Sequence, residues 1–303
     1  MLPLMVFGAQ RAFLSGIGDT RAVLSAAFWA NIANAFADWV LIHGKFGAPA
    51  LGVEGVGFAS SICTFVMLGS GILSVHMGRY GKEYGLKMVK PDLKEIWRIV
   101  RFGIPFALHL AVEMGGFTAV AVFAGWLGDI ALGAHQIALT LASTSFMVPL
   151  GMSTAANIRV SQCIGAGDED GAVLAARVCM AIGVGFMILA GTTFLLFPVE
   201  LASSFVDREG LIKAAAELIA IASIFQVCDG IQVIAGGCFR GVGDTRTPFL
   251  MNFLGHWVLG LPVGYMLAFH HEWGVSGLWW GLTVALTIVG LSLWWLFSHE
   301  RWR

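Results

Sequence analysis

The sequence predicts an all-α, polytopic helical membrane protein, and three observations support that fold class. Hydrophobic residues make up 57% of the chain and charged residues 12%, and the mean hydropathy of +0.80 lies far outside the range of soluble proteins. The apolar runs continue for about twenty residues, which suits membrane-crossing helices and excludes the shorter, alternating strands of a membrane β-barrel. The hexapeptide Gly-Ile-Gly-Asp-Thr-Arg at residues 16–21 returns as Gly-Val-Gly-Asp-Thr-Arg at residues 241–246, which indicates an internal repeat.

The apolar runs, taken in order, predict about eight full transmembrane helices and one partial helix. The first run is short for a crossing. Glycine turns of matching form follow one span after each hexapeptide, at residues 52–55 and 274–277, so whole helical units recur. The helices are expected at residues 1–15 (the partial helix), 21–43, 52–77, 102–126, 130–157, 172–197, 211–239, 247–269 and 274–297.

The repeat predicts two helical lobes of unequal length. Six predicted helices separate the hexapeptides, and because six is even, both copies face the same side of the membrane. The repeat is therefore parallel, related by an axis along the membrane normal. We expect an incomplete N-terminal lobe at residues 1–77, a basic cytoplasmic linker at residues 78–101 and a complete six-helix lobe at residues 102–303.

The distribution of lysine and arginine predicts the orientation in an inner or plasma membrane. If the hexapeptide loops and the C-terminus are cytoplasmic, only Lys45, Arg208 and Lys213 lie on the outer side. The linker carries seven basic residues, and Pro91-Asp92 marks the expected start of a helix at residues 93–100. We expect that helix to lie on the lipids of the inner leaflet.

Parallel repeats of helices are typical of secondary transporters, which carry substrate between the two halves. Several short motifs make a family resemblance specific in combination. They are Arg11, Phe13 and Leu14 with residues 18–21; residues 103–105 followed by Glu113; residues 134–139; Pro149 with Arg159, Gly165 and Gly167; and Asp229 followed by Arg240 and Gly241.

In these residues the chain resembles the multidrug and toxic compound extrusion (MATE) antiporters. The resemblance implies two six-helix lobes that export organic, often cationic, compounds driven by inward flow of protons or sodium ions. It implies no cofactor and no nucleic-acid partner, and it leaves a partner chain open. The sequence departs from the family at its N-terminus, where about three and a half helices and an acidic residue on the first helix have no counterpart.

Polar residues inside the first predicted full helix suggest a cation site. Asn34 and Asp38 are four residues apart and share a helical face, and Asn31 lies three residues before Asn34. Carboxylate and amide oxygens suit a proton or a sodium ion, and the family's N-lobe cation site resembles this pair. Ser60 and Thr64, on the next helix, are additional candidates. The alternative is a structural polar cluster between helices.

Ionisable residues in the later helices are the second set of candidates, because charged groups at membrane depth persist mainly for function or pairing. His109 and Glu113 are one turn apart, so proton exchange between them is chemically reasonable. The resemblance implies that Glu113 and Asp229 lie in the cavity of the C-terminal lobe. His135 and Gln136 are further candidates, and a structural polar contact is the alternative for each of these residues.

Other patterns have structural interpretations or point to different classes. Tryptophans cluster in the last two predicted helices, where we expect an interfacial belt and not an aromatic drug cage. Gly-Val-Ser-Gly at residues 274–277 matches the Gly-x-Ser-Gly of rhomboid intramembrane serine proteases, but no later helix follows to supply a histidine. No phosphate-binding loop occurs, which excludes direct ATP coupling. A lipid-type flippase of the same superfamily and a truncated, nonfunctional fragment remain alternatives to an antiporter.

Overall fold

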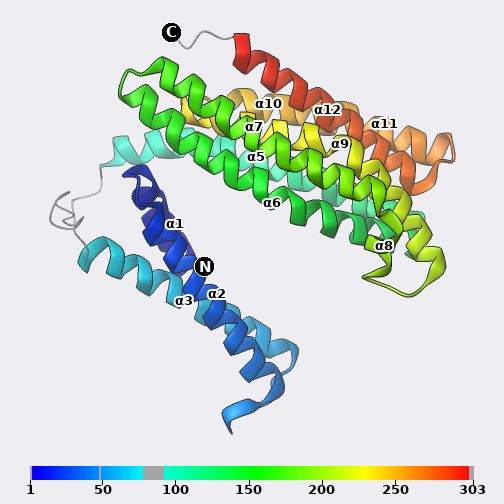
Figure 1. The fold of residues 1–303 in the computed structure, drawn as a ribbon, viewed down its shortest axis with the longest axis horizontal. Coiled ribbons are helices and arrows are strands. Elements are labelled where there is room, and N and C mark those ends of the chain that lie inside the picture. The colour runs from blue at the N-terminus through cyan, green and yellow to red at the C-terminus, as the bar shows by residue number, and fades with distance from the viewer. Residues whose placement is uncertain (1, 48, 78–91, 300–303) are drawn as a thin grey trace. The chain divides into compact units, whose positions relative to one another are not determined.

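The computed structural model describes residues 2–47, 49–77 and 92–299, and within these ranges the chain forms helices and turns with no strand. The predicted all-α class is therefore confirmed. The chain divides into two compact units, Met1–Pro91 and Asp92–Arg303. Figure 1 shows their helices in order along the chain.

The N-terminal unit consists of two long helices and shorter ones. Helices α1 and α2 both pack against α3, and the backbone of Leu41 lies 3.0 Å from where a side chain on Gly55 would begin. A Cβ at position 55 would press on the backbone of α2, and glycine avoids that contact. The elements are α1 (Leu2–Gly16), α2 (Thr20–His43), η1 (Lys45–Gly47), α3 (Val53–Ile72) and the π-helical turn η2 (Leu73–Met77).

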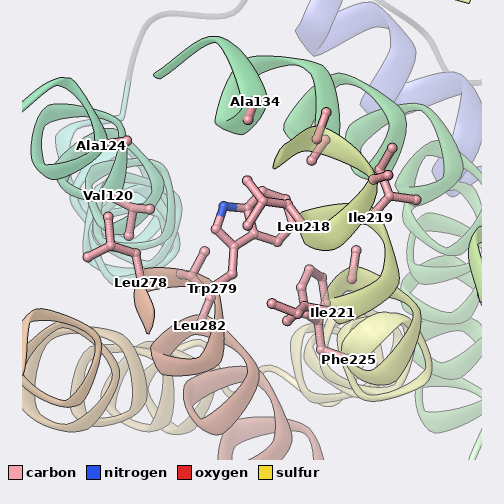
Figure 2. Close-up of a cluster of buried hydrophobic side chains, with 14 of the residues drawn as sticks. Val120, Ala124, Ala134, Leu218, Ile219, Ile221, Phe225, Leu278, Trp279 and Leu282 are labelled. Carbon is pink, nitrogen blue, oxygen red and sulfur yellow. The ribbon is translucent and has the colours of Figure 1, made fainter. Parts of the chain in front are cut away.

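The C-terminal unit is a bundle around one buried helix, α9, which packs against α6, α7, α8 and α12. Figure 2 shows large apolar side chains, among them Leu218, Phe225 and Trp279, packed between these helices. The elements are α5 (Leu93–Trp126), α6 (Asp129–Gly165), α7 (Glu169–Leu196), α8 (Pro198–Ser203), α9 (Glu209–Gly241), α10 (Arg246–Phe253), η3 (Leu254–Gly260), α11 (Leu261–Tyr265), η4 (Met266–His270) and α12 (Gly274–His299).

The two hexapeptides form the same turn. Gly18 and Gly243 have φ angles of +86° and +89°, a conformation that residues with a side chain rarely adopt. In both turns the amide of the following aspartate donates a 2.9 Å hydrogen bond to the carbonyl five residues earlier. The carboxylates of Asp19 and Asp244 then accept hydrogen bonds from backbone amides at the start of the next helix. The repeat found in the sequence is therefore a structural repeat as well.

A third copy of this turn, missed in the sequence, joins α6 to α7. Gly-Ala-Gly-Asp at residues 165–168 shares the Gly-x-Gly-Asp core of the hexapeptides. Gly167 has a φ of +74°, the Asp168 amide donates to the Cys163 carbonyl at 2.9 Å, and the Asp168 carboxylate accepts from the Gly171 amide at 2.8 Å. This copy lacks the Thr-Arg ending, so it does not match the full hexapeptide.

The helix boundaries differ from the predicted ones in two places. The prediction of a separate surface helix at residues 93–100 is wrong, because α5 runs from Leu93 through the predicted span as one helix. Its predicted start is confirmed: the Asp92 carboxylate caps the helix by accepting a hydrogen bond from the Lys94 amide. The loop expected after residue 157 is also wrong, because α6 continues to Gly165. A membrane helix can continue beyond the hydrocarbon layer of the membrane, because its backbone hydrogen bonds lie within the helix and form in water as well. Residues 78–91, with most of the predicted linker, lie outside the described residues.

Seven helices of the described chain are long and apolar enough to cross a membrane. They include every predicted full span except the one at residues 21–43. That helix exists as α2 and has 24 residues, enough for a crossing at about 1.5 Å per residue. It is less apolar than the other seven because Asn31, Asn34 and Asp38 lie along it.

Candidate functional site

A cavity inside the C-terminal unit brings Glu113 and Asp229 together. It has a volume of about 130 Å³ and lies between α5, α6, α9 and α12. Glu113 is 7% and Asp229 6% exposed, so both carboxyl groups are withdrawn from the surface. The remaining lining is mostly apolar and aromatic, from Met114, Phe117, Leu139, Ala142, Ser143, Phe146, Phe225 and Trp279.

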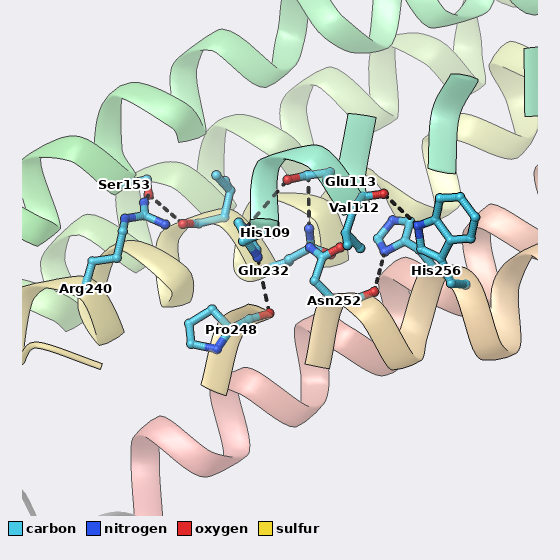
Figure 3. A network of polar contacts seen from close by, with 11 residues as sticks. His109, Val112, Glu113, Ser153, Gln232, Arg240, Pro248, Asn252 and His256 are labelled. Carbon is cyan, nitrogen blue, oxygen red and sulfur yellow. Dashed lines mark hydrogen bonds and ion pairs between the residues drawn. The ribbon is translucent and has the colours of Figure 1, made fainter. Parts of the chain in front are cut away.

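Glu113 is held by two polar neighbours (Figure 3). Its Oε1 accepts a hydrogen bond from Nε2 of Gln232 at 3.2 Å, and its Oε2 lies 3.7 Å from Nε2 of His109. The other ring nitrogen of His109 lies 3.2 Å from the Pro248 carbonyl, which can only accept, so that nitrogen carries a proton. A favourable contact between His109 and Glu113 then requires one further proton, on either the imidazole or the carboxyl group. The predicted pairing of these two residues is therefore present in the structure.

Asp229 lies one turn from Gln226 and one turn from Gln232 along α9, the most buried helix. Gln226 donates to the Ser145 hydroxyl at 2.6 Å, which ties α9 to α6. Among the described residues, no lysine or arginine forms an ion pair with Asp229 or Glu113. The cavity therefore presents two carboxyl groups whose charge a bound proton, metal ion or organic cation could neutralise.

Arg240, the cation nearest along the buried helix, is occupied elsewhere. Its Nη2 donates to the Ser153 hydroxyl at 2.8 Å, and its guanidinium lies 4.9 Å from the centre of the Phe106 ring. The Ser153 hydroxyl in turn donates to the Val233 carbonyl at 2.6 Å. These contacts join α5, α6 and α9 toward the second hexapeptide, and the Arg240 guanidinium forms no ion pair with Glu113 or Asp229 within the described chain.

His135 and Trp279 form a buried pair at the cavity. The indole nitrogen of Trp279 donates to Nδ1 of His135 at 3.2 Å, and Trp279 is 1% and His135 0% exposed. For Trp279 the expectation of an interfacial belt is therefore wrong, because this ring lines the cavity. Gln136 is exposed and is not among the residues that line the cavity. A helix places adjacent residues on different faces, which separates Gln136 from His135.

The candidates in the N-terminal unit are only partly connected. The Asn31 amide donates at 2.8 Å to the carbonyl one turn earlier, and the Thr64 hydroxyl donates at 2.9 Å to the Ser60 carbonyl, so both bonds stay within one helix. Asn34 and Asp38 are half-buried. The Oδ1 atom of Asp38 is buried and has no hydrogen-bond partner among the described residues.

Three buried amide and imidazole side chains, of α9, α10 and η3, were missed in the sequence, and one of them, Gln232, bonds to Glu113. Gln232, Asn252 and His256 are each at most 1% exposed. The sequence does indicate Gln232, because Gln226, Asp229 and Gln232 follow one another at intervals of three residues within an apolar helix and so share one helical face. Asn252 and His256 are four residues apart in another apolar segment, so they too are polar residues on one helical face.

Comparisons with known proteins agree on one family. The MatE family model matches residues 105–266. The multidrug resistance protein NorM of Burkholderia vietnamiensis is 38% identical over 97% of this chain, and a probable multidrug resistance protein NorM of Burkholderia pseudomallei (strain K96243) is 37% identical over 98%. In both cases this chain spans 64% of the relative's length.

Solved structures show the same fold. The crystal structure of the eukaryotic MATE transporter AtDTX14 superimposes with a TM-score of 0.89 at 20% identity, covering 98% of this chain and 66% of the other. A mutant of the Vibrio cholerae MATE transporter VcmN gives a TM-score of 0.84 at 17% identity over 98% of this chain and 67% of the other. At these identities the likeness concerns the fold alone.

Proposed function

Because this chain belongs to the MatE family, we propose that it acts as a secondary active antiporter that exports organic, often cationic, compounds in exchange for protons or sodium ions. The observation that carries the proposal is the convergence of Glu113 and Asp229 on one cavity with apolar and aromatic walls. Such walls suit the body of an organic cation, and the carboxylates suit its charge. The chain covers about two thirds of its relatives, so its activity as a whole is part of this proposal.

Coupling in this proposal follows from mutual exclusion. A proton or sodium ion on Glu113 or Asp229 neutralises the charge that holds the organic cation, so the two ligands compete. The neutralised site also costs less to enclose in a dry, closed state, because an unpaired buried charge is expensive. Inward movement of the small cation is thereby exchanged for outward movement of the organic one.

Competition at equilibrium tests this function. We expect a fluorescent organic cation to bind the purified protein in lipid nanodiscs, and to bind at least about tenfold more weakly when sodium is raised or the pH is lowered. Choline at equal ionic strength controls for screening. Binding that depends on neither sodium nor protons would rule out exchange. Binding of anionic lipid headgroups in preference to organic cations would favour the lipid-type flippase instead.

We also propose a second cation position in the N-terminal unit, at Asn34 and Asp38, with Asn31, Ser60 and Thr64 as additional candidates. The buried Oδ1 of Asp38 supports it, because a buried carboxylate oxygen without a hydrogen bond is costly unless a cation satisfies it. This position lies in the unit Met1–Pro91.

The proposed orientation places the hexapeptide turns, the linker and the C-terminus in the cytoplasm, with lipids of the cell membrane around the helices. In a protein without its five cysteines, we expect His271→Cys to react with an impermeant thiol reagent added outside intact cells. Arg246→Cys should react only after the cells are opened. Both side chains are exposed, so a difference in labelling reports sidedness and not burial. The reverse pattern would invert the topology.

A further inference from the structure

A groove on the outer surface of the C-terminal unit carries an arginine at membrane depth. It runs between α7 and α12 with α9 beneath, has a volume of about 410 Å³, and is lined by Arg177, Met180, Ala181, Val184, Ile231 and Trp294. We propose that this groove binds an anionic phospholipid, whose phosphate pairs with the Arg177 guanidinium and whose acyl chain lies along the apolar lining. Such a site is independent of the transport proposed above.

Glycines fix both walls of the groove on α9. On α7, a side chain on Gly183 would meet the Ile234 side chain of α9, and on α12 a side chain on Gly290 would begin 2.5 Å from the Cys228 carbonyl oxygen. Each wall helix therefore lies close to α9. Because α7 and α12 both pack on α9 (Figure 1), Ile231 of α9 forms the floor between them.

Arg177 lies within the part of α7 that is long enough to cross the membrane. α7 has 28 residues, about 42 Å at 1.5 Å per residue, whereas the hydrocarbon layer is about 30 Å thick. With the excess shared between both ends, the hydrocarbon begins about four residues after Glu169. The exposed Arg177 lies beyond that level. A charge exposed to lipid at this depth is costly unless it reaches the interface and finds a partner there.

The backbone geometry of α7 directs Arg177 toward the lipid headgroups. The Cα–Cβ bonds of a helix tilt toward its N-terminus, and α7 begins after the Gly-Ala-Gly-Asp turn at residues 165–168. The long side chain can therefore extend to the phosphate level while its apolar stem lies along the groove. In the proposed orientation these headgroups belong to the cytoplasmic leaflet.

The polar groups of the groove have no partner within the protein as described. Among the described residues, the Arg177 guanidinium has no carboxylate within ion-pair distance and no hydrogen bond. The indole N–H of Trp294 likewise donates to no group in that part of the chain. A guanidinium matches a phosphate through two parallel hydrogen bonds, and an indole N–H near the interface suits the ester carbonyls of the same lipid. The two side chains are therefore complementary to a phospholipid.

Large apolar side chains on both rims indicate that the groove opens to lipid. Leu174 and Val178 of α7 are 62% and 48% exposed, and Leu291 and Trp295 of α12 are 53% and 59% exposed. A continuous apolar surface of this kind is stable where hydrocarbon replaces water. Charge then selects the lipid, because an anionic headgroup neutralises the arginine whereas a zwitterionic headgroup brings a cation of its own.

A neighbouring groove of similar size lacks the arginine and provides an internal control. It lies between α10 and α12, has a volume of about 390 Å³, and is lined by Met251, Leu291, Ser292, Trp295 and Leu296. Its tryptophan follows Trp294 directly along α12, so both grooves lie at the same depth. With no charged side chain in its lining, this groove should accept acyl chains without distinguishing their headgroups.

Native mass spectrometry of the purified full chain in detergent tests the site by counting the lipids that remain bound. We expect the wild type to retain phosphatidylglycerol about fivefold more strongly than phosphatidylcholine with the same acyl chains. Arg177→Gln should abolish this preference, and Arg177→Lys should keep part of it, because lysine retains the charge without the planar fork. Ala181→Phe fills the groove but leaves the arginine, so it should also weaken phosphatidylglycerol binding and keeps the test valid if Arg177→Gln fails to fold.

Two controls separate this groove from the rest of the surface. Arg159→Gln removes another exposed arginine, on α6, and should leave the preference unchanged. Ser292→Phe fills the second groove and should lower the binding of both lipids equally. Equal retention of the two lipids by the wild type would overturn the site, as would an unchanged preference in both Arg177→Gln and Ala181→Phe. Displacement of the lipid by inorganic phosphate, or a dimer mass that Ala181→Phe removes, would also overturn it, in favour of a free anion or a second copy of the chain.

Discussion

Replacing Asp229 with asparagine or Glu113 with glutamine is expected to reduce ion-driven export to the background of empty vesicles. Each amide keeps the shape of the carboxyl group but fixes its charge at zero. Two unit charges 4 Å apart attract by up to about 4 kcal/mol at an effective dielectric constant of about 20. We therefore expect organic-cation affinity to fall by at least about tenfold in each variant. Uptake into vesicles under an imposed sodium or proton gradient measures the coupled reaction.

Glu217→Gln provides the matched control for these variants. Glu217 lies on the same helix as Asp229, but it is exposed and accepts a hydrogen bond from the Ser276 hydroxyl at 2.7 Å. Its amide can still accept that bond, so transport should be unchanged. The double variant of Glu113 and Asp229 should lose little more than either single variant, because both act on the same charge. Unchanged gradient-driven export in both single variants would show that these carboxyl groups are structural.

The helices were predictable from the sequence because the lipid environment requires long apolar runs. All nine predicted spans, the partial one included, fall on helical segments of the described chain, and the two hexapeptides marked their turns correctly. The errors lie where the polar ends of helices extend beyond the apolar runs, as in α5 and α6. The polar residues at those ends remain helical because their backbone hydrogen bonds continue the helix. A hydropathy profile does not show where such a helix ends.

The site was only partly predictable. Single ionisable residues within apolar helices identified Glu113 and Asp229, because charge at membrane depth stands out in any sequence. Their meeting at one cavity, and the bond between Glu113 and Gln232, 119 positions apart, depend on how helices pack. Trp279 was assigned to the interface because hydropathy cannot distinguish a ring that faces lipid from one that faces a cavity. Asn252 and His256 were overlooked because neutral polar residues are less conspicuous in a hydropathy profile than charged ones.

Helix packing in the last two spans depends on glycines that face each other. Gly260 and Gly264, in η3 and α11, lie against Gly281 of α12. Gly277, one turn before Gly281, lies against the backbone of Leu267 and Ala268 in η4. A side chain on Gly281 would begin 2.5 Å from the carbonyl oxygen of Gly260 and 2.5 Å from Cα of Gly264. Both obstacles are backbone atoms, so no side-chain rotation can relieve the contact. This is the small-xxx-small packing that brings membrane helices close together.

Gly281→Ala is therefore expected to lower the free energy of unfolding by about 2–3 kcal/mol, the upper part of the range for overpacking. Gly185→Ala should instead raise the free energy of unfolding. Gly185 lies within α7 with nothing near the position of a new Cβ, and alanine in a helix is roughly 0.5–1 kcal/mol more favourable than glycine. Unfolding in mixed micelles, followed by circular dichroism, compares the two. Equal stability of both alanine variants would mean that α12 can shift without cost.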